Sequence, residues 1–530
     1  MKKEVTTSSF WIDSAPLPSF PRLERDEDVD VVVVGAGNTG LTTAYLLAKA
    51  GKSVAVLDRA DIVEHDTAYT SAHLTMVTDK RLSELIRVFG RDHAQAAWDA
   101  GLFALEQIDT IVRDGGIACD HAWVPGYLHR PVGRQATSDE AEAFREEAEL
   151  TADLGFDARY VDQVPFIGGP GVVFEHQARI HPRRYLAGVA RAIHAAGGRI
   201  YTRSAVEEFS NQPLSVTANG HTISCRDVVL ATYTPLMGNS SMLETTLLQT
   251  KLALYSTYVV GGLVRRGQVP DGLFWDTDAP YHYLRVEPGK SGSHDYVIFG
   301  GSDHKTGQAA DTTDCYRQLE ELVQKLVPGI ELTHRWSGQV IETPDGLPYI
   351  GETAPHQFAA TGFGGNGLTF GTLAAVMATD RILDRDNPWR ELFAVSRKSI
   401  IGGAWKYVRE NKDYPYYLLR DRLTGWDGRP LRSIRQGEGR VVEQNGELVA
   451  ASRDADGSVK LVSAICTHMG CLVDWNEAES TWDCPCHGSR FRQDGSVISG
   501  PAESPLRSVA HEDKAGPHRP AQERSGVRRD

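Results

Sequence analysis

The stretch DVVVVGAGNTGLTTAYLLAKAGKSVAVLD, residues 30–58, contains the strongest pattern of the sequence. Four consecutive valines at 31–34 predict a strand buried on both faces, because such strands need no polar alternation. Apolar residues then recur at helical spacing over 39–50, and a second apolar run at 54–57 ends at an aspartate. Strand, glycine-rich turn, helix and strand in this order predict an α/β domain with a parallel sheet.

The turn carries the pattern GxGxxG, which is typical of Rossmann-like dinucleotide-binding domains. Its first glycine permits the tight turn, its second lets the backbone approach a pyrophosphate, and its third allows close helix packing. The helix attracts phosphates with its N-terminus, and the acid after the next strand can accept hydrogen bonds from ribose hydroxyls. The motif alone does not distinguish NAD from FAD. The expected cofactor-binding residues are Gly35, Gly37, Gly40 and Asp58.

Length and composition indicate a multidomain globular protein. The 530 residues are enough for roughly two to four domains, and 41% apolar with 24% charged residues is an ordinary globular composition. A formal net charge of −14 excludes a general attraction to nucleic acid or anionic lipid. The sequence contains no signal-peptide pattern and no apolar run of membrane-spanning length, so we expect a cytoplasmic protein without a membrane span.

The pattern changes three times after the first domain. Strand patterns dominate residues 251–300, where KLALYSTYVVGGLV, YHYLRVE and DYVIFGG predict an antiparallel sheet. Residues 386–428 show no sustained periodicity and predict a connector. From residue 431, short apolar runs separated by Asn-Gly and Asp-Gly turns predict a small all-β domain. Residues 511–530 are polar and aperiodic, which is typical of a disordered tail.

The all-β region contains CTHMGCLVDWNEAESTWDCPCHGS, residues 466–489, which holds four of the seven cysteines. Clustered cysteines favour a metal site over a set of dispersed disulfides. The pairs Cys466-x-His468 and Cys484-x-x-His487 supply two thiolates and two imidazoles. Such a set can hold tetrahedral zinc, and it can equally hold a Rieske [2Fe–2S] centre, in which two histidines replace two cysteines on one iron.

Several motifs together resemble the D-amino-acid-oxidase-like family of FAD-dependent amine and amino-acid oxidoreductases. They are the opening stretch, DVVLATYTP at 227–235, LPYIGE at 347–352 and TGFGGNGLTFGT at 361–372, and the likeness covers about residues 28–385. The resemblance implies FAD as the cofactor. It implies that Val206 contacts the adenine through its backbone and that Thr232 lies near the pyrophosphate.

The resemblance also places the flavin ring. The segment YTSAHLT, residues 69–75, would line the ring with Thr70 and Ser71. Backbone N–H groups of the late glycine-rich turn would lie near the pyrimidine end, where they stabilise the negative charge of reduced flavin. Some relatives attach FAD to a histidine in the segment, but Thr70 occupies that position here and His73 is displaced from it, so we expect non-covalent FAD. The turn residues are Gly362, Gly364, Gly365, Asn366 and Gly367.

The motifs CTHMGC and CPCHGS resemble the two cluster boxes of Rieske proteins of the cytochrome bc type. The resemblance implies a [2Fe–2S] cluster bound by Cys466, His468, Cys484 and His487, and a disulfide between Cys471 and Cys486. It also implies that SGPAESPL is the proline loop that covers the cluster, with Gly500 and Pro501 at its turn.

One position near the cluster departs from the high-potential Rieske pattern. Ser489 matches the serine that hydrogen-bonds a cluster sulfur, but Phe491 stands where those proteins usually have tyrosine. Hydrogen bonds to sulfur raise the potential by stabilising the reduced cluster. We therefore expect a potential in the middle of the range of roughly −150 to +300 mV.

The complete prediction is a Rossmann-like α/β FAD-binding domain, an antiparallel-sheet substrate domain and a C-terminal all-β Rieske domain. The predicted boundaries are 1–28 for an N-terminal extension, 29–385 for the oxidoreductase with its two subdomains interleaved, 386–428 for the connector, 429–510 for the Rieske domain and 511–530 for the tail.

The predicted function is a dehydrogenase or oxidase that oxidises a CH–NH group of an amine or amino acid. Electrons would pass from FAD through the cluster to an external acceptor, such as a small redox protein, a quinone or oxygen. An alternative is a reductase component that supplies another redox enzyme, although the chain has no second GxGxxG between a strand and a helix for NAD(P)H. The substrate-side candidates are Tyr281, Tyr283, Arg285, His304 and Lys305.

Overall fold

The computed structural model describes residues 5–134, 137–234, 249, 251–290, 292–309, 311–397, 431–444 and 446–509. The predicted tail at 511–530 and most of the predicted connector at 386–428 lie outside the described residues. None of the described helices has the length and apolar character that a membrane crossing requires.

A six-stranded sheet forms the first domain, and all its neighbouring strands are parallel except the pair at one edge. Residues of the valine run alternate between two cores. Val31 and Val33 pack with the helices, whereas Val32 and Val34 pack beneath a small four-stranded sheet on the opposite face. Both faces are therefore apolar, as the continuous run predicts. In spatial order the strands are β18 (Tyr349–Ala354), β19 (Gln357–Thr361), β12 (Asp227–Leu230), β2 (Val31–Val34), β3 (Val54–Leu57) and β8 (Arg199–Tyr201).

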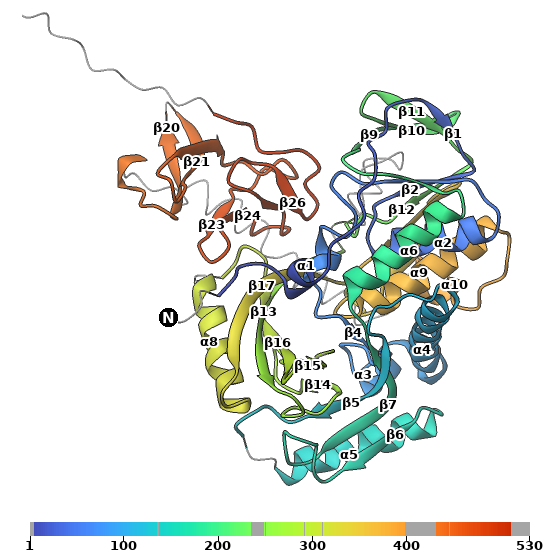
Figure 1. The fold of residues 1–530 in the computed structure, drawn as a ribbon, viewed down its shortest axis with the longest axis vertical. Helices are drawn as coiled ribbons and strands as arrows, with labels where there is room; N and C mark the ends of the chain where they lie inside the picture. The colour runs from blue at the N-terminus through green and yellow to red at the C-terminus, as the bar shows by residue number, and fades with distance from the viewer. Residues whose placement is uncertain are drawn as a thin grey trace, which may run out of the picture.

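Helices cover one face of this sheet, and the small sheet covers the other (Figure 1). Helix α2 contacts both α6 and α9, and α4 contacts α9. The helices are α2 (Asn38–Lys49), α4 (Arg91–Asp114), α6 (Pro182–Ala195) and α9 (Gly367–Ile382). The small sheet consists of β1 (Glu27–Asp28), β9 (Val206–Asn211), β10 (Leu214–Ala218) and β11 (His221–Ser224).

A nine-stranded, mostly antiparallel sheet forms the second domain, which confirms the predicted antiparallel substrate domain. Helix α8 (Thr312–Leu326) packs its apolar side against this sheet through Tyr316, Leu319 and Val323. The strands are β4 (His73–Leu74), β5 (Ala122–His129), β6 (Ala158–Val161), β7 (Gly171–Arg179), β13 (Ala253–Arg265), β14 (Leu273–Asp276), β15 (Tyr283–Glu287), β16 (His294–Lys305) and β17 (Glu331–Glu342).

Two small antiparallel sheets form the all-β domain. Their strands are β20 (Gly439–Gln444), β21 (Glu447–Arg453) and β22 (Val459–Ser463) in one sheet, and β23 (Asp474–Asn476), β24 (Thr481–Asp483), β25 (Arg490–Phe491) and β26 (Val497–Ser499) in the other. The remaining short elements are α1 (Phe10–Ser14), η1 (Asp66–Tyr69), α3 (Leu82–Phe89), α5 (Ser138–Asp153), α10 (Arg390–Phe393) and η2 (Leu431–Ser433).

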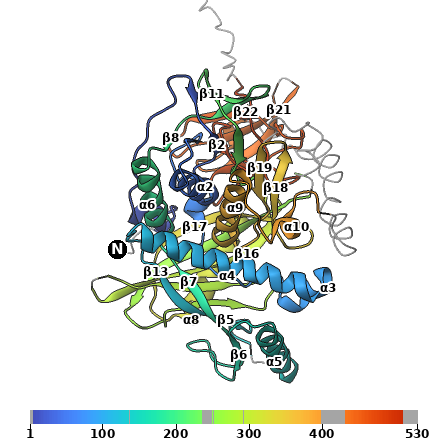
Figure 2. The same cartoon turned by 90° about the vertical axis from the view of Figure 1, so that its right-hand side faces the viewer.

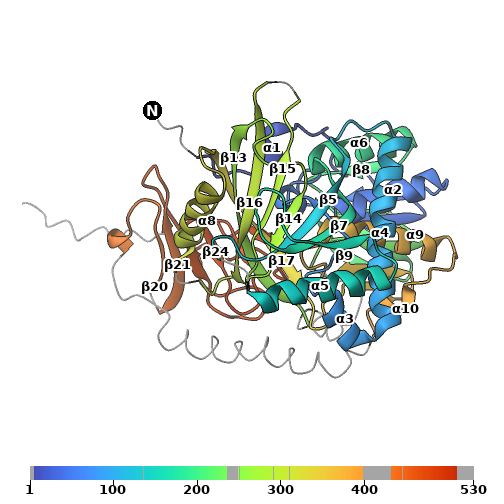
Figure 3. The same ribbon diagram turned by 90° about the horizontal axis from the view of Figure 1, so that it is seen from below.

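The all-β domain lies beside α8 and β17 of the second domain, as the orange and red ribbon shows in Figures 1 and 3. Figure 2 shows the long helix α4 crossing the opposite side of the molecule. Hydrogen bonds join the two parts. Nη1 of Arg490 donates to Oγ of Ser337 at 3.2 Å, and the backbone N–H of Ala478 donates to Oγ1 of Thr312 at 3.2 Å. The all-β domain is thus docked on the second domain.

Candidate functional site

The turn between β2 and α2 can be built only with glycine at two positions. Gly35 has a φ of +106°, and a Cβ there would lie 2.5 Å from the carbonyl oxygen of Ala231. A Cβ at Gly40 would collide with the carbonyl oxygen of Gly35. Gly37 precedes α2 and provides no side-chain cap. The N–H of Asn38 donates to Oγ1 of Thr67 at 3.4 Å, and the N–H groups that follow in the first turn can bind a phosphate.

The acid at the end of β3 stabilises this turn. Asp58 accepts hydrogen bonds from the backbone N–H of Ala36 at 2.7 Å and of Ala60 at 2.9 Å. Burial raises the pKa of the Asp58 carboxyl, although both N–H groups oppose that shift. The carboxylate therefore has a fixed orientation at the cavity described next.

A cavity of about 870 Å³ lies between the two larger sheets. Its lining comes from four segments that are far apart in the sequence: the GxGxxG turn, the 69–75 segment, the late glycine turn and part of the all-β domain. Most of the predicted site residues line it: Gly35, Gly37, Asp58, Thr70, Ser71, Val206, Thr232, Gly364, Gly365, Asn366, Gly367, Tyr281 and Tyr283. The predicted residues outside the lining are Gly40, Gly362, Arg285, His304 and Lys305.

Two buried tryptophans hold the segment at 69–75. Nε1 of Trp11 donates to the carbonyl oxygen of Thr70 at 2.7 Å, and Nε1 of Trp336 donates to that of Tyr69 at 3.0 Å. Trp11 belongs to α1, so the N-terminal extension helps to position the cavity wall. No motif in the sequence predicts this role of the extension.

His73 is a neutral imidazole in the cavity wall. Burial, together with the nearby Arg285 guanidinium, lowers the pKa of His73 to about 3. Its Nε2 lies 3.4 Å from the carbonyl oxygen of Leu284, and its Nδ1 lies 3.1 Å from Oγ of Ser71. Because a carbonyl oxygen only accepts, Nε2 carries the proton and Nδ1 accepts from the serine hydroxyl.

The late glycine turn faces the same cavity and leads into α9. Nδ2 of Asn366 donates to the carbonyl oxygens of Thr75 and Val77 at 3.1 and 3.0 Å, which joins the turn to the 69–75 segment. Asn366 makes no side-chain cap, so the start of α9 keeps N–H groups for a ligand. Two uncapped helix N-termini and a glycine cradle in one cavity fit the phosphates and the ring of a flavin dinucleotide.

The opposite part of the cavity carries tyrosines and carboxylates. The hydroxyl of Tyr281 donates to Oδ1 of Asp79 at 3.1 Å, and the hydroxyls of Tyr283 and Thr257 lie 3.1 Å apart. Asp303 completes this group. Burial raises the pKa of Asp303 to about 7, and the neighbouring Asp79 acts in the same direction.

Three substrate-side candidates lie elsewhere. Arg285 is fully buried and pairs with Glu287, and it also donates to the carbonyl oxygen of Ala72. The ring of His304 stacks on Tyr258 with centroids 5.5 Å apart. Lys305 is not part of the cavity lining. Asp303 directly precedes His304 and lines the cavity, but it was not among the predicted substrate-side residues, which included only its basic neighbours His304 and Lys305.

The two cysteine boxes form two loops with the same backbone hydrogen bonds. The N–H of Cys466 donates to the carbonyl oxygen of Cys471, and the N–H of Cys484 donates to that of Ser489, each at 2.8 Å. The N–H of Gly470 donates back to Cys466 at 3.0 Å, and the N–H of Gly488 donates back to Cys484 at 2.9 Å. The first cysteine of each box is therefore held in the same conformation.

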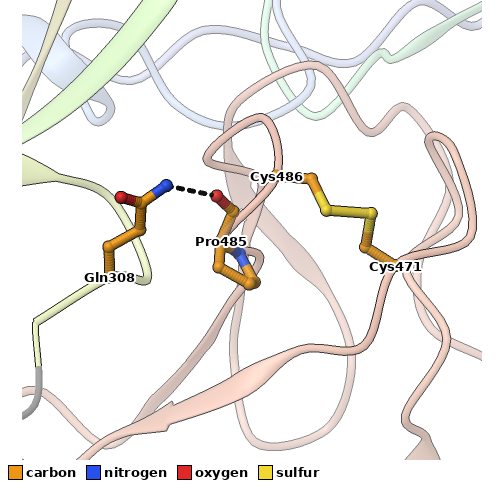
Figure 4. The surroundings of a disulfide bond; sticks show 4 residues. All are labelled: Gln308, Cys471, Pro485 and Cys486. Atoms are coloured by element: carbon orange, nitrogen blue, oxygen red, sulfur yellow. Dashed lines mark hydrogen bonds between the residues drawn. A yellow bond between two sulfur atoms is a disulfide. The ribbon is translucent and has the colours of Figure 1, made fainter. Parts of the chain in front are cut away.

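A disulfide joins the loops, as the resemblance to Rieske proteins implies (Figure 4). Cys471 and Cys486 are bonded with an S–S distance of 2.04 Å. Cys466 and Cys484 remain free and buried. Although Sγ of Cys484 lies within 4.8 Å of both bonded sulfurs, a disulfide has no thiolate to offer a metal. The available ligands are therefore the two free cysteines and the two histidines.

These four side chains fit an iron–sulfur cluster. The thiols of Cys466 and Cys484 are hydrogen-bonded to each other, and this contact lowers the pKa of Cys466 to about 7. The rings of His468 and His487 lie 4.9 Å apart at 88°. Burial lowers their pKa values to about 4 and about 3, so both imidazoles are neutral. Nδ1 of His468 is buried and has no hydrogen-bond partner among the described residues, as expected of a metal ligand.

The loop after β26 covers the two boxes. The N–H of Ala502 donates to Oγ of Ser489 at 3.1 Å, and Oγ1 of Thr467 donates to the carbonyl oxygen of Ser504 at 2.6 Å. The Ser489 hydroxyl is also hydrogen-bonded to the Cys466 sulfur. Phe491 is fully buried. The loop thus fixes the serine that the sequence places beside a cluster sulfur.

The flavin-type cavity and the cysteine boxes adjoin each other. Residues of the covering loop line the cavity. Nη2 of Arg59, in the cavity wall, donates to the carbonyl oxygen of Ile498 at 2.7 Å. Nε2 of His468 lies 3.1 Å from Oε1 of Gln249. The lining residues are Ser499 at the end of β26 and Gly500, Ala502 and Glu503 of the loop.

Comparison with known proteins identifies two families in the chain. The family model described as FAD dependent oxidoreductase matches residues 30–381, and the Rieske [2Fe-2S] domain model matches residues 429–510. YhfW of Bacillus subtilis (strain 168), a protein named for a Rieske 2Fe-2S iron–sulfur centre, is 32% identical over 511 residues, which is 94% of this chain and 97% of that protein.

Two further comparisons cover the first two domains. The gamma-glutamylputrescine oxidoreductase of Escherichia coli (strain K12) is 26% identical over 438 residues, which is 79% of this chain and 99% of that protein. The crystal structure of glycine oxidase from Geobacillus kaustophilus superposes with a TM-score of 0.57 at 17% identity, covering 70% of this chain and 99% of that chain. The latter likeness establishes the fold.

Proposed function

Because the chain belongs to the family of FAD dependent oxidoreductases and carries a Rieske [2Fe-2S] domain, we propose that it oxidises a CH–NH group of an amine or amino acid and delivers the electrons through the cluster to an external acceptor. The oxidation removes one hydrogen from carbon and one from nitrogen, and water hydrolyses the resulting C=N bond. The likeness to an enzyme named for an amine substrate supports this choice of reaction.

Bound FAD would supply the two-electron oxidation, and the [2Fe–2S] cluster would pass electrons on one at a time. The residues of this chain would hold both groups. The uncapped start of α2 and Gly37 would bind the pyrophosphate, and the start of α9 with Gly367 would stabilise negative charge on the reduced ring. Cys466, His468, Cys484 and His487 would bind the cluster.

The observation that carries the proposal is the shared wall between the two sites. The loop that covers the cysteine boxes also lines the cavity, and Gln339 of the cavity wall donates to the carbonyl oxygen of Gly488 at 2.7 Å. A short route through the protein therefore joins the cavity to the cluster loops. A small redox protein, a quinone or oxygen would receive the electrons from the cluster.

An anaerobic titration of the holoprotein tests the proposal. The probes are a panel of amines, amino acids and NADH, with flavin absorbance and the EPR signal of the reduced cluster recorded together. We expect an amine or amino acid to bleach the flavin and the cluster signal to grow afterwards. Bleaching by NADH alone would instead identify a reductase component that supplies another redox enzyme.

A further inference from the structure

Asp303 turns a carboxyl group into the cavity at the end of β16. Its Oδ1 is buried and has no hydrogen-bond partner among the residues that the structure describes. Two other carboxylates of the lining near Tyr281 and Tyr283 are engaged. Asp79 accepts from the Tyr281 hydroxyl and from the N–H of Gly365, and Asp276 accepts from the N–H groups of Asp278 and His282. Of these three carboxylates, Asp303 is therefore the one with a buried oxygen available to a ligand.

An irregularity in the sheet produces this orientation. The pairing of β13 with β16 shifts between Ser256 and Tyr258, and Ser302 adopts a φ of +58°. The shift places Asp303 toward the cavity and His304 against Tyr258 on the other side. A positive φ at serine is strained, and strain of this kind commonly accompanies a functional position.

The cavity wall offers little to a substrate carboxylate. Among the described lining residues, the basic side chains are Arg59, His65, His73 and Arg81. Arg59 donates to the covering loop, and burial keeps both histidines neutral by lowering the pKa of His65 to about 4 and that of His73 to about 3. Arg81 lies beside Glu147, where burial raises the pKa of the carboxyl and the Arg81 charge opposes that shift, and Glu84 lines the same region.

The charge of a substrate must match this wall. A substrate carboxylate buried in the cavity would need a cationic partner from the protein. The guanidinium of Arg285 cannot serve, because it is paired with Glu287 and lies outside the lining. A cationic nitrogen is matched by Asp303, because an unpartnered carboxylate oxygen can accept a charge-assisted hydrogen bond. The rings of Tyr281 and Tyr283 also line the cavity, with centroids 6.1 Å apart, and aromatic rings are favourable neighbours of a cation.

We infer that the cavity takes a cationic amine without a carboxylate beside the reacting carbon, and that Asp303 binds its ammonium group. The inference rests on the proposed function, because it specifies the substrate class of that same site. It makes Asp303 a specificity-determining residue that touches the substrate.

The test compares amines with the amino acids that differ from them only by an α-carboxylate. The probes are butylamine with norvaline and putrescine with ornithine, added anaerobically to the full-length holoprotein. The dissociation constant is taken from the perturbation or bleaching of the flavin spectrum. We expect each amine to bind at least tenfold more tightly than its amino acid. Tighter binding of the amino acids, or no binding of any of the four, would overturn the inference.

A variant then locates the recognition. Asp303→Asn keeps the shape and removes the charge, and we expect the dissociation constant of the amines to rise by roughly 10- to 100-fold. Glu149→Gln removes an exposed charge from α5, and its dissociation constants should equal those of the unmodified protein. Unchanged amine binding in Asp303→Asn with full flavin content would contradict the assignment. If that variant does not fold, the comparison of matched amines and amino acids on the unmodified protein still tests whether the cavity prefers amines.

The outcomes separate this inference from the proposed function. If norvaline or ornithine bleaches the flavin in preference to the amines, the protein is an amino-acid dehydrogenase. The proposed CH–NH oxidation then stands, and only the inference about Asp303 is wrong. Bleaching by NADH, with no response to any nitrogen compound, would overturn the proposed function and the inference together.

Discussion

Nε2 of Gln339 donates to the carbonyl oxygen of Gly488 at 2.7 Å, and this bond joins the cavity wall to the loop that contains Cys484 and His487. The same amide nitrogen donates to Oγ1 of Thr306 at 3.2 Å. Gln339 is buried on β17, so both bonds form away from bulk water. A buried amide with two partners has one orientation and holds the loop at a fixed position relative to the cavity.

Replacement of this amide should slow electron transfer without affecting substrate oxidation. In Gln339→Met the bond to Gly488 is lost at nearly constant volume, and we expect the rate of cluster reduction to fall by about two- to tenfold. Rapid-mixing absorbance would follow the flavin, and freeze-quench EPR would follow the cluster. The rate of flavin bleaching should stay the same.

A second glutamine at the same interface provides the matched control. Nε2 of Gln308 donates to the carbonyl oxygen of Pro485 at 2.9 Å, but Gln308 does not line the cavity (Figure 4). Gln308→Met should change the rate of cluster reduction less than Gln339→Met. Equal effects of the two substitutions would mean that general docking, and not this route, controls the rate.

The hydroxyl of Ser489 should raise the potential of the cluster. It is hydrogen-bonded to the Cys466 sulfur, and such a bond stabilises the more negative reduced state. We expect Ser489→Ala to lower the midpoint potential by roughly 50 to 100 mV in an EPR-monitored redox titration. Phe491→Tyr adds a hydroxyl at the position where high-potential relatives have one, and we expect the opposite change. A potential in Ser489→Ala equal to that of the parent protein would contradict this role.

The disulfide should stabilise the cluster loops. Cys471 and Cys486 are 15 residues apart, and closing a loop of this size contributes about 3 kcal/mol in the chain-entropy model. We expect the double variant Cys471→Ala, Cys486→Ala to lose the Rieske EPR signal at a lower temperature. Cys315→Ser, which changes a free cysteine of α8, is the control and should keep the transition of the parent. Identical transitions would show that the loops hold without the bond.

The flavin should be released when the protein is denatured. Both ring nitrogens of His73 are engaged, one with Leu284 and the other with Ser71, so neither is available for a covalent bond to FAD. We expect trichloroacetic acid to leave the yellow colour in the supernatant and the pellet colourless. Colour in the pellet that survives washing would contradict non-covalent binding.

The first domain and the cluster boxes were predictable because local sequence determines them. The valine run at 31–34 requires a strand with two covered faces, and the turn requires glycine at Gly35 and Gly40 for steric reasons. The disulfide and the two loops depend on six residues within one short segment. Each of these features depends on residues that are close together in the sequence, so a short motif is enough to predict it.

The substrate end of the cavity was less predictable because distant segments form it. Asp303 reaches the cavity through a register shift between β13 and β16, and no pattern in the sequence marks that shift. Arg285 is a substrate-side candidate in YHYLRVE, but it is paired with Glu287 on the same face of a buried strand. The contact between Gln339 and Gly488 joins positions 149 residues apart, and only the fold brings them together.

Amine binding should weaken as the pH falls through about 7. Burial raises the pKa of Asp303 to about 7, so its carboxyl is charged above this pH and neutral below it. The titratable groups that face it are Asp79, Glu342, His282, Tyr281 and Tyr283, and both tyrosines stay protonated in this range because burial raises their pKa values. The ammonium of an alkylamine keeps its charge over the same range, as a lysine side chain does. The dissociation constant of butylamine, measured from the flavin spectrum between pH 5.5 and pH 8.5, should therefore rise toward low pH in the parent protein and vary much less in Asp303→Asn. A parent profile as flat as that of the variant would mean that the carboxyl of Asp303 does not titrate in contact with the ligand.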